Sequence, residues 1–324
     1  MNIPTLGIDI SKAKFNVCLI NPHDKLKHKV FPNTASGFQQ LAEWLTKQHV
    51  ELIHVCLEAT GTYGEALALF LHQAGHSVSV INPAAVKAYA GAQLSRTKTD
   101  RVDAELIARF CHTQRPPLWT PPSAEVRELQ ALVRRLEALV EMRTAESNRL
   151  EAAITASAVR ASIEEHLAYL DVEIKRTEHL IREHINSDPK LKQQSELLDS
   201  IPGIAATTAA TLLAEVADIT QYRSARQLAA YAGLVPRARQ SGSSVRGRTR
   251  LSKIGNARLR KALYFPAVTA LRCSPFFQFW AKGLRERGKC KMSVIGAVMR
   301  KLVHLAYGVL KSGQPFDPEW AESA

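Results

Sequence analysis

The stretch LGIDISKAKFNVCLIN (residues 6–21) decides the fold of the first third of the chain, because it has the pattern of two successive β-strands. In the first strand, Leu6, Ile8 and Ile10 share one face by period-2 alternation, and Asp9 points to the opposite face. An acidic residue thus interrupts an otherwise apolar strand.

Strand and helix patterns alternate after this stretch. The strand pattern KHKVFPN (27–33) precedes the helical pattern SGFQQLAEWLTKQH (36–49). The strands IHVCLEA (53–59) and SVSVINP (77–83) then flank the helix YGEALALFLHQAG (63–75). Three strands, a helix and a strand–helix–strand unit form the element order of a ribonuclease-H-like fold. We therefore predict an α/β domain at the N-terminus.

A second acidic residue, Glu58, lies near the end of the strand of residues 53–59 and points away from its apolar face. An acid in an apolar strand is costly to bury unless it is paired or bound to a metal ion. Because Asp9 and Glu58 belong to separate strands of one sheet, they indicate a shared site.

The segment KTDRVDAELIARF (98–110) adds Asp100 and Asp103, which lie three residues apart and share a helix face. One alternative is ordinary helix capping, with Asp100 as the N-cap and Asp103 at the third position. Together with Asp9 and Glu58, however, the four carboxylates predict a site for one or two Mg²⁺ ions. Two ions about 4 Å apart can activate an attacking oxygen and stabilise the leaving oxygen of a phosphodiester.

The middle of the chain, after the turn-rich PPLWTPPS (116–123), has apolar residues at steps of three and four. The segment ITASAVRAS (154–162) interrupts them, so the pattern predicts two long helices folded back as an antiparallel coiled coil. The predicted apolar positions are Val126, Leu129, Val133, Leu136 and Val140, and then Ile163, Leu167, Leu170, Ile174 and Ile181. Residues 121–200 carry 11 Lys+Arg and 15 Asp+Glu, a net of −4, which favours a spacer or dimerisation arm over a DNA contact.

The positive charge of the chain is concentrated in its last third. The whole chain carries 43 Lys+Arg and 30 Asp+Glu, and its isoelectric point is near 9.7. Residues 201–324 carry 20 and 6, a net of +14, whereas residues 1–120 carry 12 and 9, a net of +3. This distribution predicts a nucleic-acid-binding surface in the last, mainly helical third.

The segment LDSIPGIAATTAATLLAEV (198–216) joins two helices through the tight turn IPGI. Gly203 allows the backbone to approach a neighbour closely, and the amides that begin the second helix can hold a phosphate. This is the helix–hairpin–helix pattern of DNA-binding proteins. The alternative is an ordinary Pro-Gly turn between packed helices.

The most basic segment, RARQSGSSVRGRTRLSKIGNARLRKALY (237–264), contains no acidic residue. We predict that its cations contact nucleic acid: Arg237, Arg239, Arg246, Arg248, Arg250, Lys253, Arg258, Arg260 and Lys261. Ser241, Ser243 and Ser244 can bind a phosphate. One of the three can instead attack phosphorus, because clustered arginines stabilise an alkoxide and the charged transition state. The alternative is a flexible basic loop that binds DNA without chemistry.

The remaining features predict a cytoplasmic protein without a membrane partner. The five cysteines are scattered without a zinc-ligand or redox spacing, so we expect reduced thiols, mostly in the core. The N-terminus has no charged and then apolar leader. No uninterrupted apolar run approaches the roughly 18 residues of a membrane helix.

The motifs follow one another in the order LGIDISK, CLEATGTYG, TKTDRVDAELIA, SIPGI, YAGLVPR, SGSSVRG, ALY and AYGVLKSG. In this order, over essentially its whole length, the chain resembles the DEDD/serine transposases of insertion sequences, the bridge-RNA-guided recombinases. The resemblance implies a RuvC-like metal-binding domain (1–118), a coiled-coil oligomerisation arm (119–195) and a serine transposase domain with the helix–hairpin–helix and the basic loop (196–324).

The resemblance also implies roles for particular residues. Asp9, Glu58, Asp100 and Asp103 match the four acids that hold Mg²⁺ in the family, and Ser241 matches its nucleophile. The implied reaction forms a covalent 5′-phosphoserine intermediate, exchanges strands and religates them without net hydrolysis.

The partners that the resemblance implies are nucleic acids and further copies of the chain. The serine and the carboxylates would come from different subunits of a homodimer. Four subunits would hold double-stranded donor and target DNA with a structured bridge RNA that pairs with both. Base pairing would read the sequence while the protein grips backbones.

Two other functions stay open from the residues alone. A metal-dependent hydrolytic nuclease of the junction-resolvase type would use the acids to activate water, and Ser241 would only bind phosphate. A non-catalytic nucleic-acid-binding protein with a decayed nuclease fold is disfavoured because all four acids are present. A hydrolase leaves free DNA ends, whereas the recombinase leaves protein attached to a 5′ end.

Overall fold

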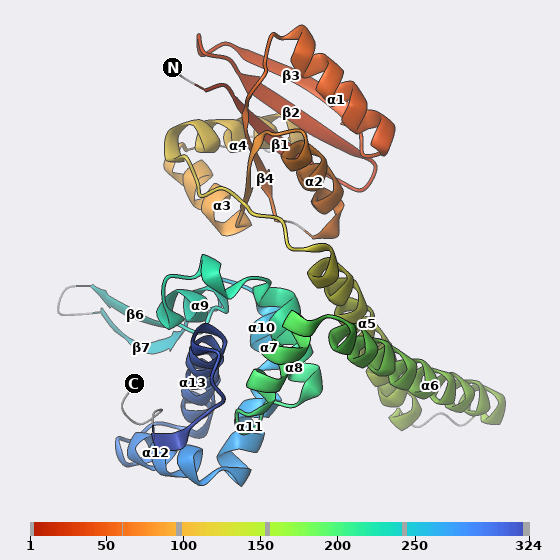
Figure 1. Ribbon diagram of the computed structural model, residues 1–324, viewed down its shortest axis with the longest axis vertical. Coiled ribbons are helices and arrows are strands. Elements are labelled where there is room, and N and C mark those ends of the chain that lie inside the picture. Colours follow the sequence, from red (N-terminus) through yellow and green to blue (C-terminus); the bar gives the residue numbers. More distant parts are fainter. Residues whose placement is uncertain (1–2, 60, 95–98, 153–155, 242–244, 320–324) are drawn as a thin grey trace. The chain divides into compact units, whose positions relative to one another are not determined.

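The computed structural model describes residues 3–59, 61–94, 99–152, 156–241 and 245–319 (Figure 1). Between residues 239 and 248 the description is limited to the backbone of two strands. The chain divides into two compact units, Met1–Pro121 and Pro122–Ala324. Each unit has a hydrophobic core of its own.

A five-stranded mixed sheet forms the centre of the first unit, in the order β3-β2-β1-β4-β5 (Figure 1). The strands are β1 (Thr5–Ile10), β2 (Lys14–Ile20), β3 (Leu26–Pro32), β4 (His54–Glu58) and β5 (Ser77–Ile81). The first three pair antiparallel, and β4 and β5 run parallel to β1. This mixed α/β unit is consistent with the RuvC-like domain expected from the sequence.

Helices cover both faces of the sheet. On one face, Leu6 and Ile8 of β1 pack with residues of α1 (Ala35–Lys47) and of α2 (Glu65–Gln73), which follows the 3₁₀ turn Thr62–Gly64. On the other face, Cys56 of β4 packs with residues of α3 (Pro83–Ala92) and α4 (Asp100–Gln114). The alternation expected in β1 therefore separates its apolar face from the face that α4 covers.

Gly7 allows α4 to lie directly on β1. A Cβ atom on Gly7 would be 2.1 Å from the backbone nitrogen of Ala108 and 2.3 Å from the carbonyl oxygen of Ala104. Both alanines are fully buried. The small side chains on both elements thus permit a contact at backbone distance, which any larger residue would open.

Thr99 caps the start of α4, because its side chain accepts a hydrogen bond from the backbone N–H of Val102. Asp100 is the first residue inside the helix. The alternative that Asp100 is the N-cap is therefore wrong, because Thr99 is the N-cap and already accepts a hydrogen bond from a backbone N–H group of the first turn.

In the part of the second unit that the structure describes, the regular elements are helices and one two-stranded ribbon (Figure 1). Its elements are α5 (Ala124–Glu151), α6 (Ser157–Ser187), α7 (Pro189–Asp199), α8 (Ala206–Val216), the 3₁₀ turn Ile219–Gln221, α9 (Ala225–Tyr231), β6 (Pro236–Ser241), β7 (Val245–Leu251), α10 (Ala257–Ala262), α11 (Tyr264–Cys273), α12 (Pro275–Glu286) and α13 (Lys291–Ser312). Residues of α13 are buried along its length, so this helix lies at the centre of the core.

The helices α5 and α6 pack side by side and antiparallel (Figure 1). Two contacts between them show the antiparallel order: Arg143 of α5 is bonded to Asp171 of α6, and the later Glu146 of α5 is close to the earlier His166 of α6. One detail of the predicted apolar pattern is wrong. Leu139 is buried and Val140 is 44% exposed, because a step of three after Leu136 places residue 139 on the packed face.

Two further sequence expectations concern burial. Cys18, Cys56 and Cys111 are buried as expected, whereas Cys273 and Cys290 are exposed. Among the described residues, α13 alone is long and apolar enough to cross a membrane, with a mean hydropathy of 1.3. Of its most apolar stretch, 56% is buried within the protein, which is typical of a core helix.

We predict that Gly7→Ala destabilises the first unit by about 2–3 kcal/mol, because the added methyl group overlaps the α4 backbone. The free energy of opening of the β1 amides, measured by hydrogen exchange, checks this expectation. Gly91→Ala in α3 is the matched control: nothing lies within 4 Å of its added Cβ, so it should be neutral or stabilising by up to about 1 kcal/mol. Equal protection in both variants would contradict the close contact.

Candidate metal and nucleic-acid site

Asp9 and Glu58 lie side by side on the sheet face that α4 covers. Asp9 is two residues after Gly7, and Glu58 is two residues after Cys56, so both side chains point to the α4 face. In the parallel β1–β4 register Gly7 pairs with Cys56, and the register therefore brings Asp9 beside Glu58 at the ends of the two strands. Both residues are half-buried.

Asn16 links this pair to α4. It pairs with Asp9 across the antiparallel β1–β2 register, and its side-chain amide donates a hydrogen bond of 3.4 Å to Oδ2 of Asp100. Asp100 and Asp103 lie in the first turn of α4, with Asp103 half-buried and Asp100 exposed. The four carboxylates that the sequence singled out thus gather at one edge of the sheet.

Lys14 places a positive charge beside Asp100. The ammonium group of Lys14 lies 3.1 Å from its Oδ2, and this hydrogen bond and charge hold the pKa of the Asp100 carboxyl below its usual range, with a smaller contribution from Asn16. The positive end of the α4 dipole favours anionic groups at the same place. Sequence reasoning missed Asn16; the available signal was a polar residue inside the apolar strand KFNVCLI.

The carboxylates are not drawn into a closed ligand cluster. Among the described residues, only one group of three acid, imidazole or thiol side chains has its possible ligand atoms within 4.8 Å of one another. It consists of His54, Cys56 and Cys111. The two cysteines are fully buried, and the contact with Cys56, together with burial, raises the pKa of the Cys111 thiol. The two cysteines belong to the packing between β4 and α4.

The predicted nucleophile lies in the β6–β7 ribbon. Ser241 is the last residue of β6 and pairs with Val245 of β7. Ser243 and Ser244 lie outside the described residues, as do the side chains of Ser241, Arg239, Arg246 and Arg248. Arg237 and Arg250 face each other in the ribbon register and are exposed.

The cations after the ribbon differ in their surroundings. Arg258 and Lys261 of α10 form ion pairs with Glu137 of α5, and Lys261 also bonds to Glu141 at 2.6 Å. Arg260 donates a hydrogen bond of 3.2 Å to the carbonyl oxygen of Ala232. Much of the positive charge counted in α10 is therefore engaged within the protein. Lys253 is exposed.

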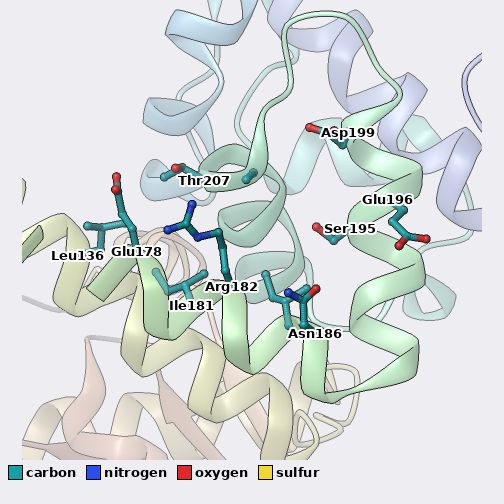
Figure 2. Close-up of a pocket in the computed structure, with 11 residues that line it drawn as sticks. Leu136, Glu178, Ile181, Arg182, Asn186, Ser195, Glu196, Asp199 and Thr207 are labelled. Atoms are coloured by element: carbon teal, nitrogen blue, oxygen red, sulfur yellow. The ribbon is translucent and has the colours of Figure 1, made fainter. Parts of the chain in front are cut away.

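The predicted hairpin of α7 and α8 is a tight turn in which Gly203 has a positive φ of 93°. A Cβ on Gly203 would be 2.5 Å from the carbonyl oxygen of Pro266, so this glycine serves a close contact with α11. The start of α8 also borders a pocket of about 310 Å³ (Figure 2). Figure 2 shows Arg182 directed toward Thr207, but Glu178, Glu196 and Asp199 give this pocket a net negative charge, which disfavours phosphate.

Two family models match the chain, and known proteins are similar to it over most of its length. Residues 6–157 match the IS110 DEDD transposase family, and residues 195–281 match the family described as "Transposase IS116/IS110/IS902 family". The chain is 37% identical to the "Pilin gene-inverting protein" of Moraxella bovis, over 96% of this chain and 97% of that protein. It is 28% identical to the "Transposase for insertion sequence element IS1111A" of Coxiella burnetii, over 88% and 84%.

The chain belongs to the IS116/IS110/IS902 family of transposases. It is thus a DNA transposase or recombinase, and transposases of the DEDD type usually use divalent metal ions. The oxygen donors of the acidic edge fit such ions, because hard divalent cations prefer carboxylates.

We predict that Lys14→Met in this transposase raises the pKa of Asp100 toward its usual value near 3.8, because the ammonium group no longer stabilises the carboxylate. Because the pKa of Asp100 is lowered in the folded protein, its ion pair with Lys14 stabilises the fold above pH 3.8. This contribution is lost as the pH falls through the lowered pKa. Carbon-13 NMR titration of the aspartate carboxyl groups measures the change. Asp171, which is paired with Arg143, is the control and should not move. An unchanged pKa of Asp100 in Lys14→Met would contradict the conclusion that Lys14 lowers it.

Proposed function

We propose that this transposase is a conservative recombinase of an insertion sequence, which cuts and rejoins DNA through a serine-linked intermediate. The observation that carries the proposal is the shared edge of Asp9, Glu58 and the first turn of α4, in a chain whose last third carries a net charge of +14. An acidic edge and a basic ribbon in one chain suit an enzyme that needs both metal and a protein nucleophile.

The four carboxylates Asp9, Glu58, Asp100 and Asp103 hold one or two Mg²⁺ ions in this proposal. Support comes from the all-oxygen donor set, from the register that makes Asp9 and Glu58 neighbours, and from the hydrogen bond of Asn16 that orients Asp100. When bound, the metal stabilises negative charge on the oxygens of the phosphodiester.

Ser241 is the proposed nucleophile. Its hydroxyl oxygen bonds to phosphorus as the bond between phosphorus and the 3′ oxygen breaks. The serine proton passes to a base, the departing 3′ oxygen takes up a proton, and the 5′ phosphate stays on the serine. Attack by the 3′ hydroxyl of the partner strand reverses these steps and frees the serine, so no phosphodiester is lost to water. Support comes from the arginine-rich ribbon in which Ser241 lies.

The proposed assembly is a homodimer in which one subunit supplies Ser241 and the other the carboxylates, and two dimers form a tetramer on DNA. Residues 1–118 serve metal chemistry, 119–195 form a coiled-coil arm for assembly, and 196–324 carry the serine and the helix–hairpin–helix. Apolar side chains exposed on the arm support this role: Val140, Met142, Val159, Tyr169, Val172 and Leu180.

The proposed partners are double-stranded donor and target DNA and a structured bridge RNA, met in the cytoplasm. The cations of the ribbon grip sugar-phosphate backbones, which carry no sequence information. Pairing with RNA supplies the missing selectivity. The name of the Moraxella bovis relative suggests inversion as a second outcome of the same chemistry, when both recombination sites lie on one molecule.

We predict that the wild-type chain, denatured during reaction with a DNA substrate containing the element ends and Mg²⁺, carries DNA attached through a 5′ phosphate. Ser241→Ala should lose this adduct and recombination, because no hydroxyl remains to attack. Glu58→Gln should also lose both. Gel mobility followed by peptide mass spectrometry measures the adduct.

The neighbouring variants Ser243→Ala and Ser244→Ala are matched controls and should retain the adduct. Free 5′ ends without an adduct would instead favour hydrolysis. If Glu58→Gln still recombined DNA, the proposed role of the Glu58 carboxylate in the reaction would be wrong.

We predict further that the protein, expressed with the DNA flanking its own gene, co-purifies with one RNA of fixed length, because a guide must stay bound while DNA is sampled. Sequencing of the bound RNA and comparison with a preparation from a cell that lacks the flanks measure this. A broad mixture of cellular RNA in both preparations would contradict guidance.

A further inference from the structure

A second concave surface lies between α11, α12 and α13, away from the ribbon in sequence. The pocket has a volume of about 440 Å³. Its apolar lining consists of Val268 and Leu271 of α11 with Val294 and Ile295 of α13. A volume of this size is within the range of small-molecule sites and can hold one nucleotide.

Three cations surround the apolar lining: Arg272, Arg285 and Lys291, one from each helix. All three are exposed, and none forms an ion pair with another described residue. They differ in this from Arg258 and Lys261, which α5 neutralises. None of the described residues that line the pocket is acidic, so its field favours an anion that also has an apolar part.

Phe265 extends the same surface. It lies three residues before Val268 and seven before Arg272, so the three share one face of α11. Its side chain is 75% exposed, and Val268 is 37% exposed. An exposed aromatic ring beside an apolar, cation-lined hollow provides the stacking surface and the phosphate contacts that single strands use.

We propose that this pocket binds an unpaired nucleotide of single-stranded nucleic acid, with its base against Val268 and Phe265 and the adjacent phosphates at Arg272, Arg285 and Lys291. A duplex does not fit this chemistry, because its bases are stacked and paired and offer no face to an apolar pocket. The inference rests on the proposed function only in that nucleic acid is the substrate; recombination exposes unpaired DNA, and a guide RNA contains unpaired loops.

The test measures binding of the full-length chain to a fluorescent 20-nucleotide single strand, as DNA and as RNA, and to the corresponding DNA duplex. Phe265→Ala should weaken binding of the single strands about tenfold, because a stacked base is lost, and leave duplex binding unchanged. The triple variant Arg272→Ala, Arg285→Ala, Lys291→Ala should weaken single-strand binding. The slope of the logarithm of the binding constant against the logarithm of the salt concentration should become shallower by about two, because three phosphate contacts are lost. The DNA and RNA arms identify the source of the nucleotide.

A second triple variant, Lys190→Ala, Lys192→Ala, Lys282→Ala, removes the same charge from exposed positions outside the pocket and is the matched control. A photoreactive 5-iodouracil in the single strand should crosslink to the peptide that contains Phe265. Equal losses in both triple variants, parallel losses for duplex and single strand, or a crosslink elsewhere would overturn the proposal. A change of oligomeric state in Phe265→Ala with unchanged binding would also overturn it, in favour of a protein interface.

The two proposals fail separately. Loss of the Ser241 adduct with an intact crosslink at Phe265 would leave the nucleotide pocket standing, and an adduct without pocket binding would leave the recombinase standing.

Discussion

The contact between the α4 backbone and Gly7 is the constraint on which the acidic edge depends. With no Cβ at Gly7, the helix lies at backbone distance from β1, and its first turn lies against the start of β2, where Asn16 and Lys14 contact Asp100. Alternation then turns Asp9 toward the helix, and the β1–β4 register adds Glu58. A helix lifted by one methyl group would move Asp100 and Asp103 away from both strand acids.

The positive charge of the last third has three different structural settings. Part lies in the β6–β7 ribbon around Ser241, part is paired with Glu137 and Glu141 on α5, and part surrounds the pocket of α11–α13. Net charge describes the long-range attraction for a polyanion but does not identify the cations that touch it. Ion pairs between α5 and α10 also tie the long-helix arm to the basic part of the unit.

Local patterns predicted the five strands of the first unit and the helices α1, α2 and α4, because each depends on residues near in sequence, but they did not predict α3. The alternation of LGIDIS and IHVCLEA reflects the two faces of a strand, and the strands of the structure follow it. The predictions that were wrong concern positions where two neighbouring residues suit the same role. Thr99 and Asp100 are both good caps, and residues 139 and 140 are both allowed steps after Leu136. In the structure Thr99 is the cap and Leu139 is the buried residue.

The sequence by itself determined which residue types occur and which face of a strand or helix they share: the strand acids opposite the apolar face, the acid-free basic segment and the two long apolar repeats. Only the tertiary structure decided which elements meet. Strand register made Asp9 and Glu58 neighbours, Asn16 joined them to Asp100, and α5 neutralised Arg258 and Lys261. The reason is that periodicity is a local property of the backbone, whereas register and helix packing depend on contacts between residues far apart in the chain.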